Sequence, residues 1–151
     1  MKLILALIFL LIAGFALLVR LAPVDPARWH TDPAKAAKGR AGGFALRPGG
    51  DAEPPEFSVP DLLARLDAIA MATPRTTRIA GSVEDGRITY QTRSKLWGFP
   101  DYTTIAVASV EGGAMPLIDA RLRFGKSDLG VNRKRVEGWL AQLDAAIGIA
   151  D

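Results

Sequence analysis

The stretch TTRIAGSVEDGRITYQTR, residues 76–93, has the pattern of a β-hairpin. Two segments rich in β-branched residues, 76–83 and 87–93, flank the sequence Glu84–Asp85–Gly86. An Asp-Gly pair tolerates the positive φ angles that a tight hairpin turn requires. We therefore expect two neighbouring antiparallel strands joined by a short turn.

A second hairpin follows along the chain. Residues 102–110 and 117–123 flank Glu111–Gly112–Gly113, and Ile105 and Val107 fall on the same face of the first of these segments. Alternation of this kind is typical of an antiparallel sheet with one covered face. The two hairpins together predict a four-stranded antiparallel sheet.

Helical periodicity is found on both sides of the hairpins. Residues 60–72 are predicted to form a helix with Ser58 as its N-cap, and Pro74 ends it. The last helix is predicted over 131–147. The fold class is therefore α+β in the order α-β-β-β-β-α, with both helices packed on one face of the sheet. The expected buried stripes are Leu62, Leu63, Leu66, Ile69 and Ala70 in the first helix, and Val136, Trp139, Leu140, Leu143 and Ile147 in the last.

The N-terminus predicts a membrane anchor. Residues 3–19 are unbroken apolar residues between Lys2 and Arg20, and as a helix they span about 25 Å, or slightly more if residues 3–22 are counted. A cleaved signal peptide is the alternative. Its hydrophobic region is usually shorter, and the small-residue pair that could mark cleavage, Gly14 and Ala16, lies inside the apolar run. The organisation predicted is an anchor over 1–22, a tether over 23–56 and a domain over 57–151.

The tether is predicted from its Gly-Gly pairs and prolines, which favour loop or extended chain. Trp29 is expected at the headgroup belt of the membrane, and His30 is expected to be a solvated loop residue. The topology is open from charge alone. The cations after residue 19 favour a cytoplasmic domain, whereas a signal-anchor layout favours an exported one.

Composition limits the chemistry. The 151 residues include no Cys and a single His, which excludes disulfides, thiolate metal sites and His-rich metal centres. We predict no metal site, no cofactor and no catalytic residue, because the one imidazole lies in the tether and no pair of carboxylates is singled out by spacing. The net charge of +3 is too small an excess to predict nucleic-acid binding.

The most unusual stretch is RLRFGKSDLGVNRKR, residues 121–135. It places three consecutive cations in the first turn of the last helix, where the macrodipole disfavours positive charge. One explanation is an anion site made of cations and free backbone N–H groups. The other is internal pairing of the arginines with Asp128, Asp119 or Asp101. The predicted ligand-binding residues are Arg123, Lys126, Ser127, Asp128, Asn132, Arg133 and Arg135.

These observations predict a membrane-anchored, non-enzymatic domain that binds a protein partner or an anionic group through the 121–135 loop–helix junction. The anionic group could be a small molecule or a lipid headgroup. Two alternatives stay open: a small enzyme that uses Asp101 or Asp128 as a base with an arginine-polarised anionic substrate, and an accessory subunit of a membrane complex. The aromatic loop 97–99 is expected to close the end of the core, and contact with a partner is the alternative.

Residues 123–135 resemble the bacterial and plastid family catalogued as domain of unknown function 1499. Its fingerprint R-x-G-x-S-D-x-G-x-N-x-x-R is matched here, and its F-P-D element corresponds to residues 99–101. The likeness extends over about residues 29–143. This chain has Ala120 and Leu122 where members tend to have serines. The matched fingerprint residues are Arg123, Gly125, Ser127, Asp128, Gly130, Asn132 and Arg135.

The resemblance implies no established activity, substrate or cofactor. Members of the family are often preceded by a membrane span or an export signal. The resemblance therefore favours a single-pass protein of the bacterial inner membrane with its domain in the periplasm.

Overall fold

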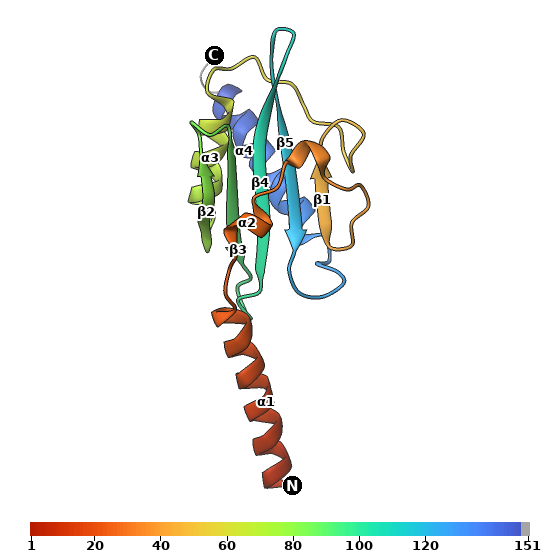
Figure 1. The fold of residues 1–151 in the computed structure, drawn as a ribbon, viewed down its shortest axis with the longest axis vertical. Helices are drawn as coiled ribbons and strands as arrows, with labels where there is room; N and C mark the ends of the chain where they lie inside the picture. The colour runs from red at the N-terminus through yellow and green to blue at the C-terminus, as the bar shows by residue number, and fades with distance from the viewer. Residues whose placement is uncertain (149–151) are drawn as a thin grey trace.

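The computed structural model describes residues 1–148, in which a long helix leads into an α+β domain (Figure 1). The predicted order of elements is confirmed, with additions near the N-terminus. The elements are α1 (Lys2–Leu21), α2 (Pro26–Trp29), the 3-10 turn η1 (Pro33–Lys35), β1 (Gly43–Leu46), α3 (Leu62–Ala72), β2 (Thr76–Ser82), β3 (Arg87–Arg93), β4 (Pro100–Val110), β5 (Gly113–Leu122) and α4 (Val131–Gly148).

The sheet has five antiparallel strands in the order β1-β5-β4-β3-β2, so the prediction of four strands was wrong by one. Both predicted hairpins are present. The additional strand, β1, lies within the stretch 23–56 that we expected to be a tether, and it pairs with β5 from Gly43↔Arg121 to Leu46↔Ile118. Four residues between Gly-rich turns carry too little alternation to signal a strand, and the edge of β5 supplies the pairing that the local sequence does not.

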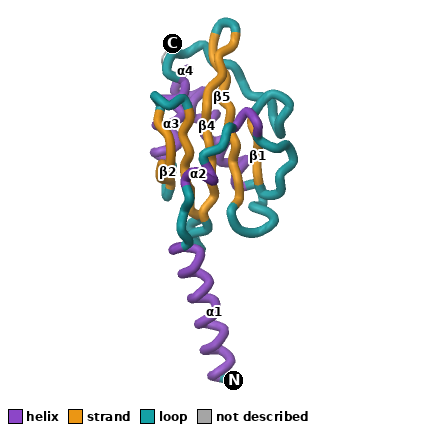
Figure 2. Tube along the Cα trace, viewed as in Figure 1, coloured by secondary structure: helices purple, strands orange, loops and turns teal. Residues whose placement is uncertain are grey.

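Helices α3 and α4 cover one face of the sheet, as predicted (Figure 2). The apolar core lies between them and the sheet. The helix α3 begins at Leu62 after Asp61, and Ser58 is not its N-cap because the Ser58 hydroxyl donates to the Gly112 carbonyl instead. Core side chains include Phe44, Leu46, Leu63, Leu66, Ile88, Tyr90, Ile105, Ile118, Val136, Trp139 and Leu143.

The opposite face of the sheet is polar, and it is also covered. Residues 26–36, here called the strap, contain α2 and η1 and cross this face in front of β3, β4 and β5 (Figures 1 and 2). Beneath the strap, several polar side chains are almost fully buried: Thr89, Gln91, Thr104, Asp119 and Arg121. We expected one covered face, and the sheet has two.

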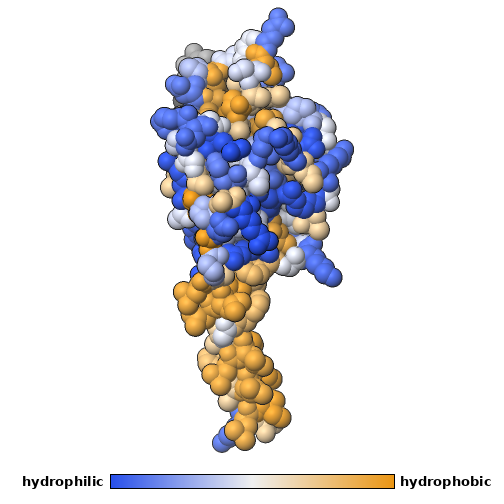
Figure 3. Space-filling view, viewed as in Figure 1, coloured by the Kyte–Doolittle hydropathy of each residue, from blue (hydrophilic) through white to orange (hydrophobic). Residues whose placement is uncertain are grey.

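Helix α1 is long and apolar enough to cross a membrane, although a signal sequence near an N-terminus has the same properties. Its apolar side chains are mostly exposed, in contrast to those of a core helix. Figure 3 shows this apolar helix below a domain whose visible face is mainly hydrophilic.

Candidate functional site

The strap is shaped by two short capped turns. The Asp25 carboxylate accepts the Ala27 N–H and precedes Pro26, and the Asp32 carboxylate accepts the Ala34 N–H and precedes Pro33. A capping carboxylate followed by proline at the first helical position is a strong start signal for a helical turn. The sequence of the strap therefore specifies its own two turns, although neither is long enough to persist without the sheet.

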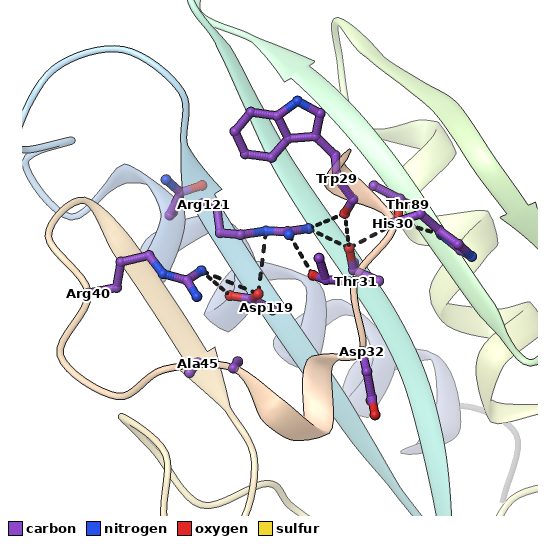
Figure 4. Close-up of polar contacts among 12 residues, drawn as sticks. Trp29, His30, Thr31, Asp32, Arg40, Ala45, Thr89, Asp119 and Arg121 are labelled. Atoms are coloured by element: carbon purple, nitrogen blue, oxygen red, sulfur yellow. Dashed lines mark hydrogen bonds and ion pairs between the residues drawn. The ribbon is translucent and has the colours of Figure 1, made fainter. Parts of the chain in front are cut away.

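Arg121 of β5 fixes the strap to the sheet (Figure 4). Its guanidinium donates from Nη1 to the Thr31 hydroxyl and from Nη2 to the Trp29 carbonyl, each at 2.6 Å. Nη2 also donates to Thr104 Oγ1 on β4, at 2.6 Å. One buried side chain thus joins the strap to two strands, and charged hydrogen bonds of this kind are among the stronger ones in proteins.

A chain of hydrogen bonds extends the same network across the sheet. Arg87 Nε donates to His30 Nε2 at 3.2 Å, so the other ring nitrogen, Nδ1, carries the proton and donates to Thr89 Oγ1 at 2.9 Å. Thr89 pairs with Thr104, and the Thr104 hydroxyl donates to the Trp29 carbonyl. Burial and the neighbouring Arg87 lower the pKa of His30. His30 is therefore a half-buried member of the network, and the expectation of a solvated loop residue was wrong.

Asp119 lies between two arginines (Figure 4). Its side chain is 4% exposed, and Arg40 Nη1 donates to both carboxylate oxygens at 3.0 and 3.3 Å. Arg121 Nε lies 3.4 Å from Oδ2. Burial raises the pKa of Asp119, and the two guanidinium groups oppose that rise. Two cations thus share one carboxylate, which leaves the triad of Arg40, Asp119 and Arg121 with an excess positive charge.

Trp29 forms a wall beside this triad. Its ring stacks on Tyr102 with a centroid distance of 3.9 Å, and Arg28 and Arg121 lie over it at 5.6 and 5.5 Å. Trp29 therefore lies on the face of the sheet, and its expected position at the headgroup belt stays a prediction. An open cavity of about 440 Å³ adjoins it, lined by Arg28, Trp29, Thr31, Asp32, Lys35, Ala36, Arg40, Asp119, Arg121 and Leu122.

The predicted junction site is partly interior. Asp128 caps α4 by accepting the N–H groups of Gly130 and Asn132. Asn132 is fully buried, donates to the Gly42 carbonyl and accepts from Arg135. Arg135 also reaches Asp101 at 3.4 Å. These fingerprint residues thus tie α4 to β4 and to the turn before β1.

The other predicted site residues lie nearer the surface. Arg123 donates to the Tyr102 hydroxyl and to the Pro23 carbonyl, and Arg133 pairs with Glu137 at 2.8 Å. Ser127 accepts the Leu129 N–H, and Lys126 is exposed. The structure therefore does not gather the seven predicted residues around one cavity, and their role in ligand binding stays a prediction.

Asp101 is the second buried carboxylate with an unusual environment. Burial raises its pKa, and Arg135 opposes the rise. Its Oδ1 atom is buried and has no hydrogen-bond partner among the described residues. Asp101 also lines an open cavity of about 370 Å³ together with Ser127 and Asp128.

Asp119 was not predicted as a site residue, Arg40 was treated only as part of the tether, and Trp29 was expected at the membrane. A usable signal was present in β5, where Asp119 and Arg121 alternate with the apolar residues Ile118 and Ala120. Ionisable residues at every second position of a strand predict a polar second face. Thr104 of β4 and Thr89 of β3 continue this polar face across the sheet. Such a face becomes a buried network only when another segment packs over it, and the sequence did not show that the strap does so.

Comparison with known proteins gives one match. The family model described as "Protein of unknown function (DUF1499)" matches residues 22–143, which include the strap, the whole sheet and most of α4. No curated protein and no solved structure matches the chain. Because the match covers most of the chain, the protein belongs to the DUF1499 family.

Proposed function

We propose that this protein is a single-pass, membrane-anchored, non-enzymatic domain that binds a small organic anion in the cavity beneath the strap. The length and apolar character of α1 support the anchor. A position in the bacterial inner membrane with a periplasmic domain is supported by the membrane spans and export signals that often precede members of the family. The proposal keeps the anionic ligand of the sequence hypothesis and moves its site from the 121–135 junction to the face of the sheet.

The observation that carries the proposal is the charge around the cavity. Four cations line it, Arg28, Lys35, Arg40 and Arg121, against two carboxylates, Asp32 and Asp119. Both terminal nitrogens of Arg121 already donate hydrogen bonds. Arg40 donates only from Nη1, to Asp119, and among residues 1–148 its Nε and Nη2 have no partner, so they are available to a ligand. The side chain of Lys35 is 85% exposed at the rim. The excess positive charge favours an anion.

The lining of the cavity also favours an organic ligand over a bare ion. The ring of Trp29 and the side chains of Ala36 and Leu122 provide apolar surface beside the cations. Binding sites for small molecules commonly combine such walls with a few oriented polar groups. A carboxylate or phosphate attached to a flat apolar group would use both features.

Benzoate tests this proposal as a model ligand. The chain has three tryptophans and so gives three indole N–H signals by NMR, which Trp29→Phe assigns. We expect benzoate, added to the full chain in detergent micelles, to shift the Trp29 signal with a Kd of about 1 mM or weaker. Arg40→Gln should weaken binding about tenfold, because a charged hydrogen bond is lost.

Two controls make the test specific. Arg78→Gln removes the same charge from β2, where Arg78 pairs with Asp67 of α3, and it should leave benzoate binding unchanged. Benzamide has the same ring without the charge and should not bind. Equal shifts with benzamide, or with Arg40→Gln, would contradict an anion site. A stoichiometric protein that co-purifies in mild detergent, and that Arg40→Gln releases, would favour the accessory-subunit alternative.

A second candidate function rests on Asp101. A buried carboxylate with a raised pKa, one unpaired oxygen and a position in the lining of a cavity is suited to act as a general base. This observation keeps the enzyme alternative, with Arg135 as its charge partner. Asp101→Asn, which preserves shape, would abolish any turnover while leaving benzoate binding at the strap cavity intact.

A further inference from the structure

The end of α1 packs against the loop between β3 and β4. Arg20 donates to the Leu96 carbonyl at 3.2 Å, and Phe15 contacts Phe99 with a ring-centroid distance of 6.0 Å. An apolar cleft of about 420 Å³ lies between the helix and the loop, lined by Leu11, Ile12, Phe15, Trp97 and Phe99. The loop 94–99 therefore lies alongside the helix and not beyond its end.

This arrangement sets the depth of the loop relative to α1. At about 1.5 Å per residue, Phe15 lies about 9 Å and Leu11 about 15 Å before the helix end at Leu21. If α1 spans a bilayer with Arg20 at the headgroups, Trp97 is at the level of the interface and the upper acyl chains. Leu96 and Trp97 are 75% and 41% exposed, and tryptophan is enriched at membrane interfaces.

A cationic pocket adjoins the same loop. It has a volume of about 390 Å³ and is lined by Arg20, Arg75, Thr77, Gln91, Arg93, Ser94, Lys95 and Gly98. None of these lining residues carries a carboxylate. Within residues 1–148 none of its four cations forms an ion pair. Their contacts are with neutral carbonyls, since Arg75 donates to the Arg93 carbonyl and Arg93 to that of Gly98.

Four like charges around one pocket repel one another unless an anion lies among them. In the strap cavity the protein supplies part of that negative charge itself, through Asp119, and here it supplies none. The pocket lies at the C-terminal end of α1, where the phosphates of a bilayer would be. Cations near such a surface gain about 1 kcal/mol each from anionic lipid.

The loop between β5 and α4 extends the same surface. It lies at the end of the domain that faces α1 (Figure 1), and it exposes Leu129 (88%) and Lys126. Figure 3 shows the apolar side chains of α1 reaching the base of the domain, with hydrophilic ones directly above. Exposed apolar side chains, Leu96, Trp97 and Leu129, next to a cationic pocket match the neighbouring layers of acyl chains and phosphates in a bilayer.

We propose that this end of the domain is seated on the membrane, with Leu96 and Trp97 in the interface and a phosphate of an anionic phospholipid in the pocket of Arg20, Arg75, Arg93 and Lys95. The inference rests on the membrane span of the proposed function, and it is independent of the ligand beneath the strap.

The experiment uses the full chain in phosphatidylcholine vesicles that contain a small fraction of brominated lipid, which quenches tryptophan on contact. Brominated phosphatidylglycerol should quench Trp97 several-fold more than brominated phosphatidylcholine at the same fraction. Trp97→Phe should remove the quenched component, and Trp29→Phe should not. Arg75→Gln and Lys95→Gln should each lower the preference for phosphatidylglycerol about fivefold, while Arg78→Gln on the same strand as Thr77 should not.

The outcomes separate the two proposals. Protein that an alkaline wash strips from the vesicles would overturn both the anchor and this inference. Protein that stays in the bilayer with Trp97 unquenched, or quenched equally by the two lipids, would keep the anchor and overturn the seated domain. Loss of the phosphatidylglycerol preference on adding inorganic phosphate at constant ionic strength would show that the pocket binds free phosphate and not the lipid.

Discussion

Arg121→Met is expected to lower the free energy of unfolding by about 3–5 kcal/mol, because it leaves Asp119 buried with one of its two cationic partners missing. The substitution also removes the donors to Thr31, to Thr104 and to the Trp29 carbonyl. Methionine has nearly the length of the arginine stem, so the loss is mainly electrostatic. Urea denaturation of the full chain in detergent, followed by near-UV circular dichroism, measures the change.

A double variant separates the network from simple packing. Asp119→Asn combined with Arg121→Met removes both members of the buried pair and should cost less than the sum of the two single variants, because each single variant already loses the interaction between them. Arg123→Met is the matched control. Arg123 directly follows β5, and its guanidinium donates to neutral acceptors, the Tyr102 hydroxyl and the Pro23 carbonyl. Its replacement should lower the free energy of unfolding by about 1 kcal/mol or less. Additive losses would contradict the network.

Arg135→Met is expected to destabilise the domain by a similar amount at neutral pH and by much less in mild acid. Burial raises the pKa of Asp101, so the stability that this group contributes is present in acid and is lost as pH rises through its folded-state pKa. Arg135 limits that rise. Without it the pKa of Asp101 rises further, and the variant loses stability over a wider range of pH.

Paired denaturation curves at about pH 4.5 and about pH 7.5 measure this dependence. In the variant, Asp101 can bury itself as the neutral acid at the lower pH, so the deficit relative to the wild type should shrink. Arg133→Met is the control, since Arg133 forms an exposed pair with Glu137 on α4 worth about 0.3–0.5 kcal/mol. A deficit for Arg135→Met that is the same at both pH values would mean that Asp101 stays ionised.

The hairpins and the two core helices could be predicted because each carries its own local signal. Asp85–Gly86 and Gly112–Gly113 mark the turns. The apolar spacing of α4 marks the face of the helix that packs on the core, where Trp139 is buried. These features depend on residues close together in the sequence.

The strap and β1 could not be predicted in this way. The structure of both segments depends on partners far along the chain. Arg121 hydrogen-bonds to Trp29 and Thr31, and β5 pairs with Gly43–Leu46. Glycine and proline in that stretch give the correct signal for turns but carry no information on what the turns pack against. The candidate cavity is built from this stretch, so it was missed for the same reason.

The fingerprint residues illustrate a different limit. Cations at the N-terminus of α4 correctly marked an unusual site, and the sequence left open whether a ligand or an internal acid neutralises them. Arg135 turns inward to Asp101 because its side chain is long enough to reach β4, whereas Arg133 meets Glu137 one turn along α4. The four-residue spacing of Arg133 and Glu137 predicts their pairing, but the pairing of Arg135 with Asp101 is seen only in the fold.

Hydrogen–deuterium exchange over residues 26–36 tests the central claim, that Arg121 folds this segment onto the sheet and so forms the cavity that we propose as an anion site. The amides of His30, Lys35 and Ala36 donate to carbonyls within the strap. We expect them to be protected in the full chain and to exchange much faster in Arg121→Met than in Arg123→Met. Exchange of these amides at the rate of an unstructured chain in the wild type would contradict the account.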